Sequence, residues 1–410
     1  MRGASVLISG VGIAGPALAY WLQRYGFLPT LIERAPALRT TGYVIDFWGA
    51  GYDLTERMGL LPRVLAAGYR MREVRIVDDR GRPVGGFDAD EFRAATDNRL
   101  TSLPRGALSE ILYDAVAPLE TIFGNSITSL TPHGDGVFVD FEHGPGRRFD
   151  LVIGADGLHS IVRALTFGAE SRFERFLGYT VAAFEVAAYP VRDENVYVGY
   201  TVPGRQIARF ALRHDRTMFL FIVADPAPPP FDPHDMTHHR AYLRERFGGA
   251  GWECDAILDA LDAAEDIYFD RVSQIRLPRW SVDRIALVGD AACAPSLLAG
   301  QGSALAIIGA YVLAGELARA ATPADAFAAY EGRLRAFIAG KQRSAATFGG
   351  AFAPRTRFGI WFRNLVTRAF ALPGVARLAI GRSLADQIEL PEYGAGNGTP
   401  GTLGRTGGSN

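Results

Sequence analysis

The segment from residue 6 to residue 33 constrains the fold more than any other part of this chain. An apolar run at 6–8 predicts a buried strand, and Gly10, Gly12 and Gly15 follow as G-x-G-x-x-G where strand would pass into helix. The first glycine of this pattern permits a tight turn, the second lets backbone approach a pyrophosphate, and the third packs helix on strand. Glu33 ends a second predicted strand, in the place where an acid accepts hydrogen bonds from an adenosine ribose. The whole order predicts a dinucleotide-binding unit; a glycine-rich turn of another α/β protein is the alternative.

Length, net charge and cysteine content limit the kinds of partner that this chain can bind. At 410 residues the chain is long enough for two or three units. A net charge of -1 argues against nucleic acid or an anionic membrane as main partner. Cys254 and Cys293 lie far apart without metal-ligand spacing, which argues against a disulfide framework or zinc site and predicts a cytoplasmic location. Because the chain has no apolar run of about 18 residues, we expect no stable membrane insertion.

A second informative place covers residues 149–163. A predicted strand at 149–153 leads into a glycine turn that holds Asp156, and Ser160 and Arg163 follow. An aspartate and an arginine around such a turn would suit the pyrophosphate arm of a bound cofactor. Asp156 as a simple helix cap is the alternative.

A third informative place covers residues 284–317. A predicted strand at 285–288 leads into Gly289 and Asp290, and Gly300, Gln301 and Gly302 open a long helix of small residues. The N-terminus of such a helix presents unpaired N–H groups, which suit a phosphate or an anionic flavin ring. Asp290 would accept hydrogen bonds from ribityl or sugar hydroxyls.

The remaining segments predict a sheet and flanking helices. Residues 73–87 read as a hairpin, 126–153 as a small meander, and 180–223 as an antiparallel sheet. His238 and His239 fall in a predicted helix, where a solvated face is favoured over a metal site. Residues 357–380 form a basic apolar stretch, either a helix packed over the body of the protein or a membrane-surface helix.

With three motifs in this order, residues 4–392 resemble the FAD-dependent monooxygenases related to para-hydroxybenzoate hydroxylase. Residues 10–15 with Glu33 match the ADP-binding motif, residues 154–163 match the D-G motif, and residues 289–302 match the G-D motif. Within that family the sequence is most similar to tetracycline-inactivating flavoproteins and actinobacterial natural-product hydroxylases.

The resemblance implies an α/β fold in which a Rossmann-like FAD-binding domain is interleaved with an antiparallel-sheet substrate domain. The expected ranges are 1–70, 98–172 and 275–350 for the FAD-binding domain, 71–97 and 173–274 for the substrate domain, 351–392 for a C-terminal helical segment, and 393–410 for a disordered tail.

The motifs and the resemblance together predict the site residues. The expected cofactor contacts are Gly10, Gly12, Ile13, Ala14, Gly15, Glu33, Arg34, Arg39, Asp46, Arg105, Asp156, Arg163, Gly289, Asp290, Pro295, Gly300, Gln301, Gly302 and Ser303. The expected substrate contacts are Phe47, Trp48, Phe87, Phe184, Tyr200, Phe210, Phe221, Pro295 and Leu297. Strand alternation allows only half of the sheet aromatics to reach a substrate.

Four residues depart from the family pattern. Cys293 stands where the family has an aromatic residue or histidine, Leu297 replaces a proline, and Phe47 with Trp48 replaces more polar residues of the tetracycline enzymes. These departures put tetracycline itself in doubt as the substrate. A covalent flavin link at Cys293 is less favoured than a packing role.

The resemblance implies that NAD(P)H reduces FAD, that O2 forms a flavin C4a-hydroperoxide, and that an aromatic or polyketide-like molecule is hydroxylated. No residue is assigned as acid or base, no metal is expected, and the protein would be a monomer or homodimer. The alternatives are tetracycline-type antibiotic inactivation, a non-oxygenating reductase or FAD-binding sensor, and a halogenase, whose W-x-W-x-I-P signature is absent.

Overall fold

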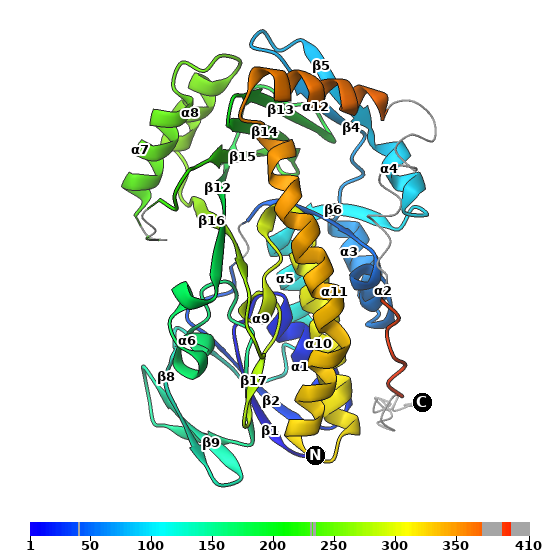
Figure 1. Cartoon of the computed structure of the whole chain (residues 1–410), viewed down its shortest axis with the longest axis vertical. Coiled ribbons are helices and arrows are strands. Elements are labelled where there is room, and N and C mark those ends of the chain that lie inside the picture. The colour runs from blue at the N-terminus through cyan, green and yellow to red at the C-terminus, as the bar shows by residue number, and fades with distance from the viewer. Residues whose placement is uncertain (40–41, 230–231, 233–234, 371–387, 395–410) are drawn as a thin grey trace, which may run out of the picture.

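The computed structural model describes residues 1–39, 42–229, 232, 235–370 and 388–394, without the side chains of 91, 92, 95, 299 and 346–349. In this part of the chain, two sheets follow one another along the long axis of the molecule (Figure 1). Two long strands and one long helix connect the halves.

The first sheet has the order β17-β18-β11-β1-β2-β7 and is parallel except at the edge strand β17. Val6, Leu7 and Ile8 in its centre have no exposed surface, as expected for a parallel sheet that is covered on both faces. Its strands are β1 (Ser5–Ser9), β2 (Leu28–Glu33), β7 (Thr121–Phe123), β11 (Leu151–Gly154), β17 (Ser281–Val282) and β18 (Ile285–Leu287).

Helices α1 (Ala14–Arg24) and α10 (Gly302–Arg319) pack against each other in this half. By length and composition α10 could cross a membrane, but 78% of its most apolar window is buried inside the protein. It is therefore a core helix. A small sheet of β8 (Ile127–His133), β9 (Gly136–Phe141) and β10 (Arg147–Phe149) lies beside β11 and β1.

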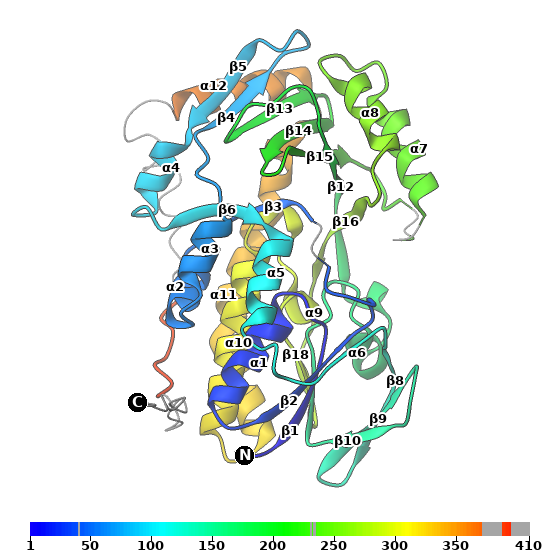
Figure 2. The ribbon, with the colours of Figure 1, turned by 180° about the vertical axis from the view of Figure 1, so that it is seen from behind.

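The second sheet has the order β16-β12-β15-β14-β13-β4-β5, antiparallel except between β13 and β4. Its β12 and β16 extend down toward the first sheet (Figure 2). Its strands are β4 (Glu73–Val77), β5 (Pro83–Asp88), β12 (Glu174–Ala187), β13 (Val196–Val202), β14 (Arg205–Leu212), β15 (Arg216–Ala224) and β16 (Tyr268–Ile275). Helices α7 (Met236–Phe247) and α8 (Cys254–Asp262) cover one face.

A two-stranded ribbon, β3 (Val44–Trp48) with β6 (Leu100–Pro104), lies between the halves. Helix α11 (Pro323–Phe352) runs the length of both halves, and α12 (Arg357–Ala369) lies across β5 and β13 (Figure 1). The remaining helices are α2 (Ala50–Arg57), α3 (Leu61–Ala67), α4 (Ala89–Ala95), α5 (Arg105–Asp114), α6 (Ile161–Phe167), α9 (Asp290–Cys293) and the 3-10 turns η1 (Glu170–Arg172) and η2 (Leu297–Ala299).

Two predictions of local structure need correction. The expected strand at 149–153 is divided at Asp150, because β10 ends in the small sheet and β11 begins in the parallel sheet. Tyr393, expected in a disordered tail, is buried, and its hydroxyl donates to Glu316 Oε1 at 2.6 Å. A Cβ at Gly315 would lie 2.3 Å from the Tyr393 ring, so this glycine makes room for the ring. Residues 395–410 of the expected tail and 371–380 of the expected C-terminal helix lie outside the described residues.

Candidate functional site

The glycine loop between β1 and α1 is shaped by two kinds of contact. A Cβ at Gly10, where φ is +106°, would lie 2.5 Å from Ala155 O, and one at Gly15 would lie 1.9 Å from Gly10 O. These two glycines let neighbouring backbones approach closely. A Cβ at Gly12 would meet only the Arg105 guanidinium, at 3.7 Å, so the middle of the loop is open on that side.

Glu33 lies at the end of β2, beside this loop. Its two carboxylate oxygens accept backbone hydrogen bonds from Val11 N at 3.0 Å and Ala35 N at 2.9 Å. The remaining lone pairs can accept hydrogen bonds from a ribose. Arg34 and Arg39 follow with exposed side chains.

Asp156 acts as a cap within the protein. Its carboxylate accepts hydrogen bonds from Ser160 Oγ, Ile161 N and Val162 N at the start of α6. Burial raises the pKa of Asp156, and these hydrogen bonds oppose the shift. Of the two expected roles, the helix cap describes these contacts.

Arg163 does not lie where a cofactor contact was expected. Its side chain has no exposed surface, and its guanidinium donates to Ala291 O at 3.2 Å, Leu158 O at 2.6 Å and Glu170 Oε2 at 2.6 Å. A fully enclosed group cannot reach a bound molecule. Arg163 instead ties α6 to α9, the turn that carries Asp290.

The turn after β18 brings Asp290 to the N-terminus of α10. Gly289 has a φ of +64°, and a Cβ there would lie 3.1 Å from Ala14 Cβ, so α1 also packs closely at this point. The Asp290 carboxylate is 3.6 Å from the position of a Cβ on Gly302. No side chain caps this helix start among the described residues, and Gln301 at the N-cap makes no capping bond. Its first N–H groups are therefore available to bind an anion.

Arg105 lies at the start of α5, between Gly12 and Asp290. In the described part of the chain its guanidinium makes no hydrogen bond or ion pair. Burial raises the pKa of Asp290, and the Arg105 charge opposes the shift. An open glycine loop, an unpaired arginine, a carboxylate and an uncapped helix fit the phosphate and ribityl groups of FAD.

Cys293 is buried beside this site. Its Sγ lies 3.6 Å from Gly289 O, and burial raises the pKa of the thiol well above its usual range. A neutral, enclosed thiol is a poor nucleophile. The placement therefore favours the packing role over a covalent link.

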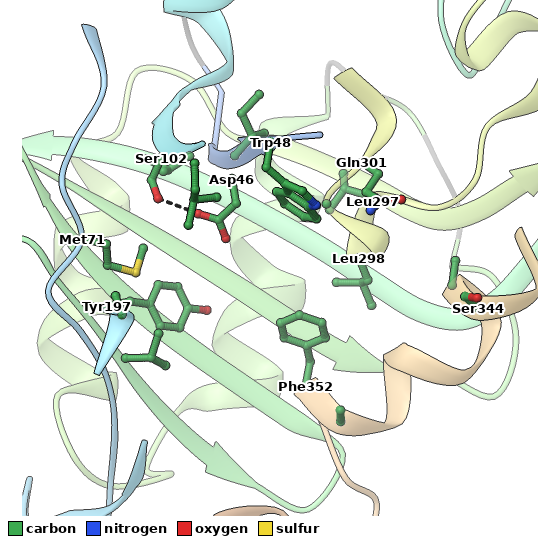
Figure 3. Close-up of a pocket in the computed structure, with 18 of the residues that line it drawn as sticks. Asp46, Trp48, Met71, Ser102, Tyr197, Leu297, Leu298, Gln301, Ser344 and Phe352 are labelled. Atoms are coloured by element: carbon green, nitrogen blue, oxygen red, sulfur yellow. Dashed lines mark hydrogen bonds between the residues drawn. The ribbon is translucent and has the colours of Figure 1, made fainter. Parts of the chain in front are cut away.

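A cavity of about 2230 Å³ lies next to the FAD-fitting residues. The second sheet, the β3–β6 ribbon, η2 and the helices α11 and α12 enclose it. Figure 3 shows Trp48, Leu297, Leu298 and Phe352 around this space, with Asp46 and Tyr197 facing it. Gln301, at the N-terminus of α10, also lines it, so the cavity meets the cofactor residues at that point.

The structure divides the expected substrate residues into two groups. Trp48, Phe87 and Leu297 line the cavity. The others do not: Phe47 is in the core of the first half, Phe210 is covered by the edge of the Tyr69 ring, and Pro295 is buried with its carbonyl bound by Gln274.

Strand alternation explains why the remaining three expected substrate residues do not line the cavity. Phe184, Tyr200 and Phe221 lie on the face of the second sheet that α7 and α8 cover, in one apolar cluster. The opposite face carries Tyr197 and Gln206 into the cavity. Sequence alternation marks two faces but does not say which face a helix covers.

Several cavity residues were not predicted, among them Ser102, Phe352 and Arg363. Ser102 lies on β6, where no strand was predicted, and Phe352 and Arg363 come from the C-terminal segment, where no local motif signals a site. The expected solvated helix face is wrong for His239, which is buried and stacks on Phe269 with ring centroids 4.3 Å apart.

Comparison with known proteins matches residues 3–339 to the FAD binding domain family. The chain is 33% identical over 404 residues to a flavin-dependent monooxygenase from an unknown prokaryotic organism, covering 95% of this chain and 98% of the relative. It is 37% identical over 359 residues to an uncharacterised protein of Mycobacterium tuberculosis strain H37Rv, covering 86% of this chain and 96% of the relative.

Among solved structures, the tetracycline destructase Tet(55) superposes with a TM-score of 0.82 and 32% identity, covering 96% of this chain and 100% of that one. The expected cofactor is confirmed as FAD by the family match. The chain belongs to the FAD-dependent monooxygenases of the para-hydroxybenzoate hydroxylase family.

Proposed function

We propose that this monooxygenase uses NAD(P)H and O2 to hydroxylate a flat, largely apolar aromatic or polyketide-like molecule. The observation that carries the proposal is the shared wall at Gln301, which belongs both to the start of α10 and to the large cavity. A molecule in the cavity would lie beside the cofactor residues. The volume of about 2230 Å³ leaves room for several fused rings.

The residues of the chain would do three things. Arg105, Asp290 and the N-terminus of α10 would hold the cofactor. Bound FAD, once reduced by NAD(P)H, would supply an electrophilic oxygen atom derived from O2. Trp48, Leu298 and Phe352 would exclude water from that oxygen and keep the ring against it.

A second candidate is tetracycline-type antibiotic inactivation, which the likeness to tetracycline destructase Tet(55) favours. Trp48 and Leu297 lie in the cavity wall and replace the family's usual residues, so they would change which ring system fits.

The test uses the purified FAD-loaded protein with polycyclic phenols and tetracycline. NAD(P)H oxidation, H2O2 release and incorporation of ¹⁸O from ¹⁸O2 into product are measured together. Product labelled with one ¹⁸O atom, with NAD(P)H consumption exceeding H2O2 release, is expected. NAD(P)H oxidation that yields only H2O2 with every compound would contradict this function and favour a reductase.

A further inference from the structure

Among the charged residues that line the cavity, Asp46 and Arg363 lie on different walls. Asp46 extends from β3, next to Trp48, at the end that meets the cofactor residues. Arg363 extends from α12 and lies beside Thr201 of β13, at the opposite side of the cavity from Asp46. In Figure 2, α12 lies at the top of the molecule and β3 lies below it, near the junction of the two halves.

Arg363 is held by neutral acceptors only. Its guanidinium donates to Thr201 Oγ1 at 3.0 Å, Asn364 Oδ1 at 3.0 Å, Ala351 O at 3.3 Å and Phe352 O at 3.4 Å. Burial lowers the pKa of Arg363, yet a guanidinium stays protonated in proteins. These bonds fix its position without neutralising its charge.

In the described part of the chain, Arg363 differs from the other cavity arginines in being half-buried without a carboxylate partner. Arg213 and Arg343 also lack one there, but both are exposed to solvent. Arg93 pairs with Asp90, and Arg333 pairs with Glu316. Arg363 has no carboxylate partner among the residues that the structure describes. Buried charges in proteins are normally paired, so a net positive charge faces the cavity.

Asp46 presents the complementary group. Its Oδ1 accepts a hydrogen bond from Ser102 Oγ at 2.6 Å. Its other oxygen accepts none from the described residues and points into the cavity (Figure 3). Burial raises the pKa of Asp46, and the Ser102 bond opposes the shift. One oxygen is therefore available as an acceptor for a ligand hydroxyl.

Both charges act on the same space. The Tyr197 hydroxyl lies in the cavity, where Gln206 Nε2 donates a hydrogen bond to it at 3.3 Å. Burial raises the pKa of Tyr197. The Asp46 charge adds to this shift, whereas the Gln206 bond and the Arg363 charge oppose it. A molecule beside Tyr197 would thus lie between a positive and a negative group. Such a field would orient a polar ligand.

We propose that Arg363 and Asp46 form a two-point recognition site for a flat molecule that carries a carboxylate or acidic enolate at one end and a hydroxyl group at the other. The anionic group binds Arg363, and the hydroxyl donates to Asp46 at the cofactor end. This inference rests on the proposed function, because it assumes that the cavity holds the substrate. It makes both side chains specificity-determining.

The test measures binding to the FAD-loaded protein without NAD(P)H, by equilibrium dialysis. The probes are 6-hydroxy-2-naphthoate, its methyl ester, which lacks the charge, and 2-naphthoate, which lacks the hydroxyl. Arg363→Gln and Asp46→Asn are compared with matched controls. Arg368→Gln removes an exposed charge from the same helix, and Glu194→Gln removes a carboxylate from the cavity rim.

We expect the wild type to bind the hydroxy acid at least about tenfold more tightly than the ester, and R363Q to lose that preference. D46N should lose the preference for the hydroxy acid over 2-naphthoate, whereas R368Q and E194Q should keep both. Equal wild-type affinities, unchanged preferences in R363Q and D46N, or no saturable binding of any probe would overturn the proposal. The binding assay does not depend on turnover. A failure of this proposal is therefore distinguishable from a failure of the proposed function, which the ¹⁸O measurement detects.

Discussion

The Arg163→Met substitution tests whether this side chain is structural or contacts the cofactor. The substitution leaves Ala291 O and Leu158 O without the hydrogen bonds that Arg163 donates, and it removes an ion-pair partner of Glu170. Breaking a buried ion pair costs about 3–5 kcal/mol. Glu170 has 25% of its side chain exposed and keeps His159 as a partner, so we expect a cost at the lower end of this range. With about 1 kcal/mol for each of the two carbonyls, we expect the unfolding free energy to fall by about 5 kcal/mol.

Urea unfolding of the FAD-free protein, followed by circular dichroism, measures this change. The control is Arg172→Met, because Arg172 is exposed and should change the unfolding free energy by less than about 1 kcal/mol. Arg163→Lys keeps the charge and provides a folded comparison if the methionine variant does not fold. An unchanged urea midpoint together with a large loss of FAD affinity in R163M would refute this reasoning and place Arg163 at the cofactor.

Three further predictions follow from the same structure. His159 bonds Glu170 at 2.9 Å and Asp270 at 3.2 Å; burial lowers its pKa, but these partners raise it to about 9. This pKa exceeds that of a histidine in the unfolded chain, about 6.5. Wild type should therefore be more stable than H159Q by about 1–2 kcal/mol below pH 6.5 and should lose this advantage as the pH rises through 9. Urea unfolding at a series of pH values measures the difference. Arg105→Met should weaken FAD binding at least about tenfold in equilibrium dialysis, with little change in unfolding of the FAD-free protein. Phe221→Ala should lower the unfolding free energy by about 3–5 kcal/mol and leave the affinity for 6-hydroxy-2-naphthoate unchanged.

Each of these has a control and a contrary outcome. H159Q with the same pH profile as wild type would mean that His159 carries no ion-pair charge. Arg24→Met, an exposed arginine on α1, should leave FAD affinity unchanged, and equal affinity in R105M would remove Arg105 from the site. Phe138→Ala, on the exposed side of β9, should cost little stability. A loss of naphthoate binding in F221A would place Phe221 on the cavity side of the sheet.

Much of the FAD-binding half was predictable because its signals are local. Gly10 and Gly15 have no side chain where backbones approach within contact distance, and Gly289 has a positive φ beside α1. Such backbone requirements leave a direct trace in the amino-acid sequence. Most strands of the second sheet were equally readable, since β-branched and aromatic residues mark them without reference to the rest of the fold. The exception is β16 (Tyr268–Ile275), for which no strand was predicted.

The substrate half of the site depended on packing between distant segments. Whether Tyr197 or Tyr200 faces the cavity was settled when α7 and α8 covered one face of the sheet. Arg163 matched a cofactor motif, but its neighbours in space enclose it completely.

The amino-acid sequence by itself determined the cofactor class and the elements that hold it, because glycine spacing, strand patterning and a helix start act over short distances along the chain. Only the tertiary structure placed Asp46 of β3 and Arg363 of α12 around one cavity. Those two residues are far apart in sequence, and no pattern links them. The physical reason is that charge pairing and exclusion of water depend on which surfaces meet, and that is decided by the packing of the whole chain.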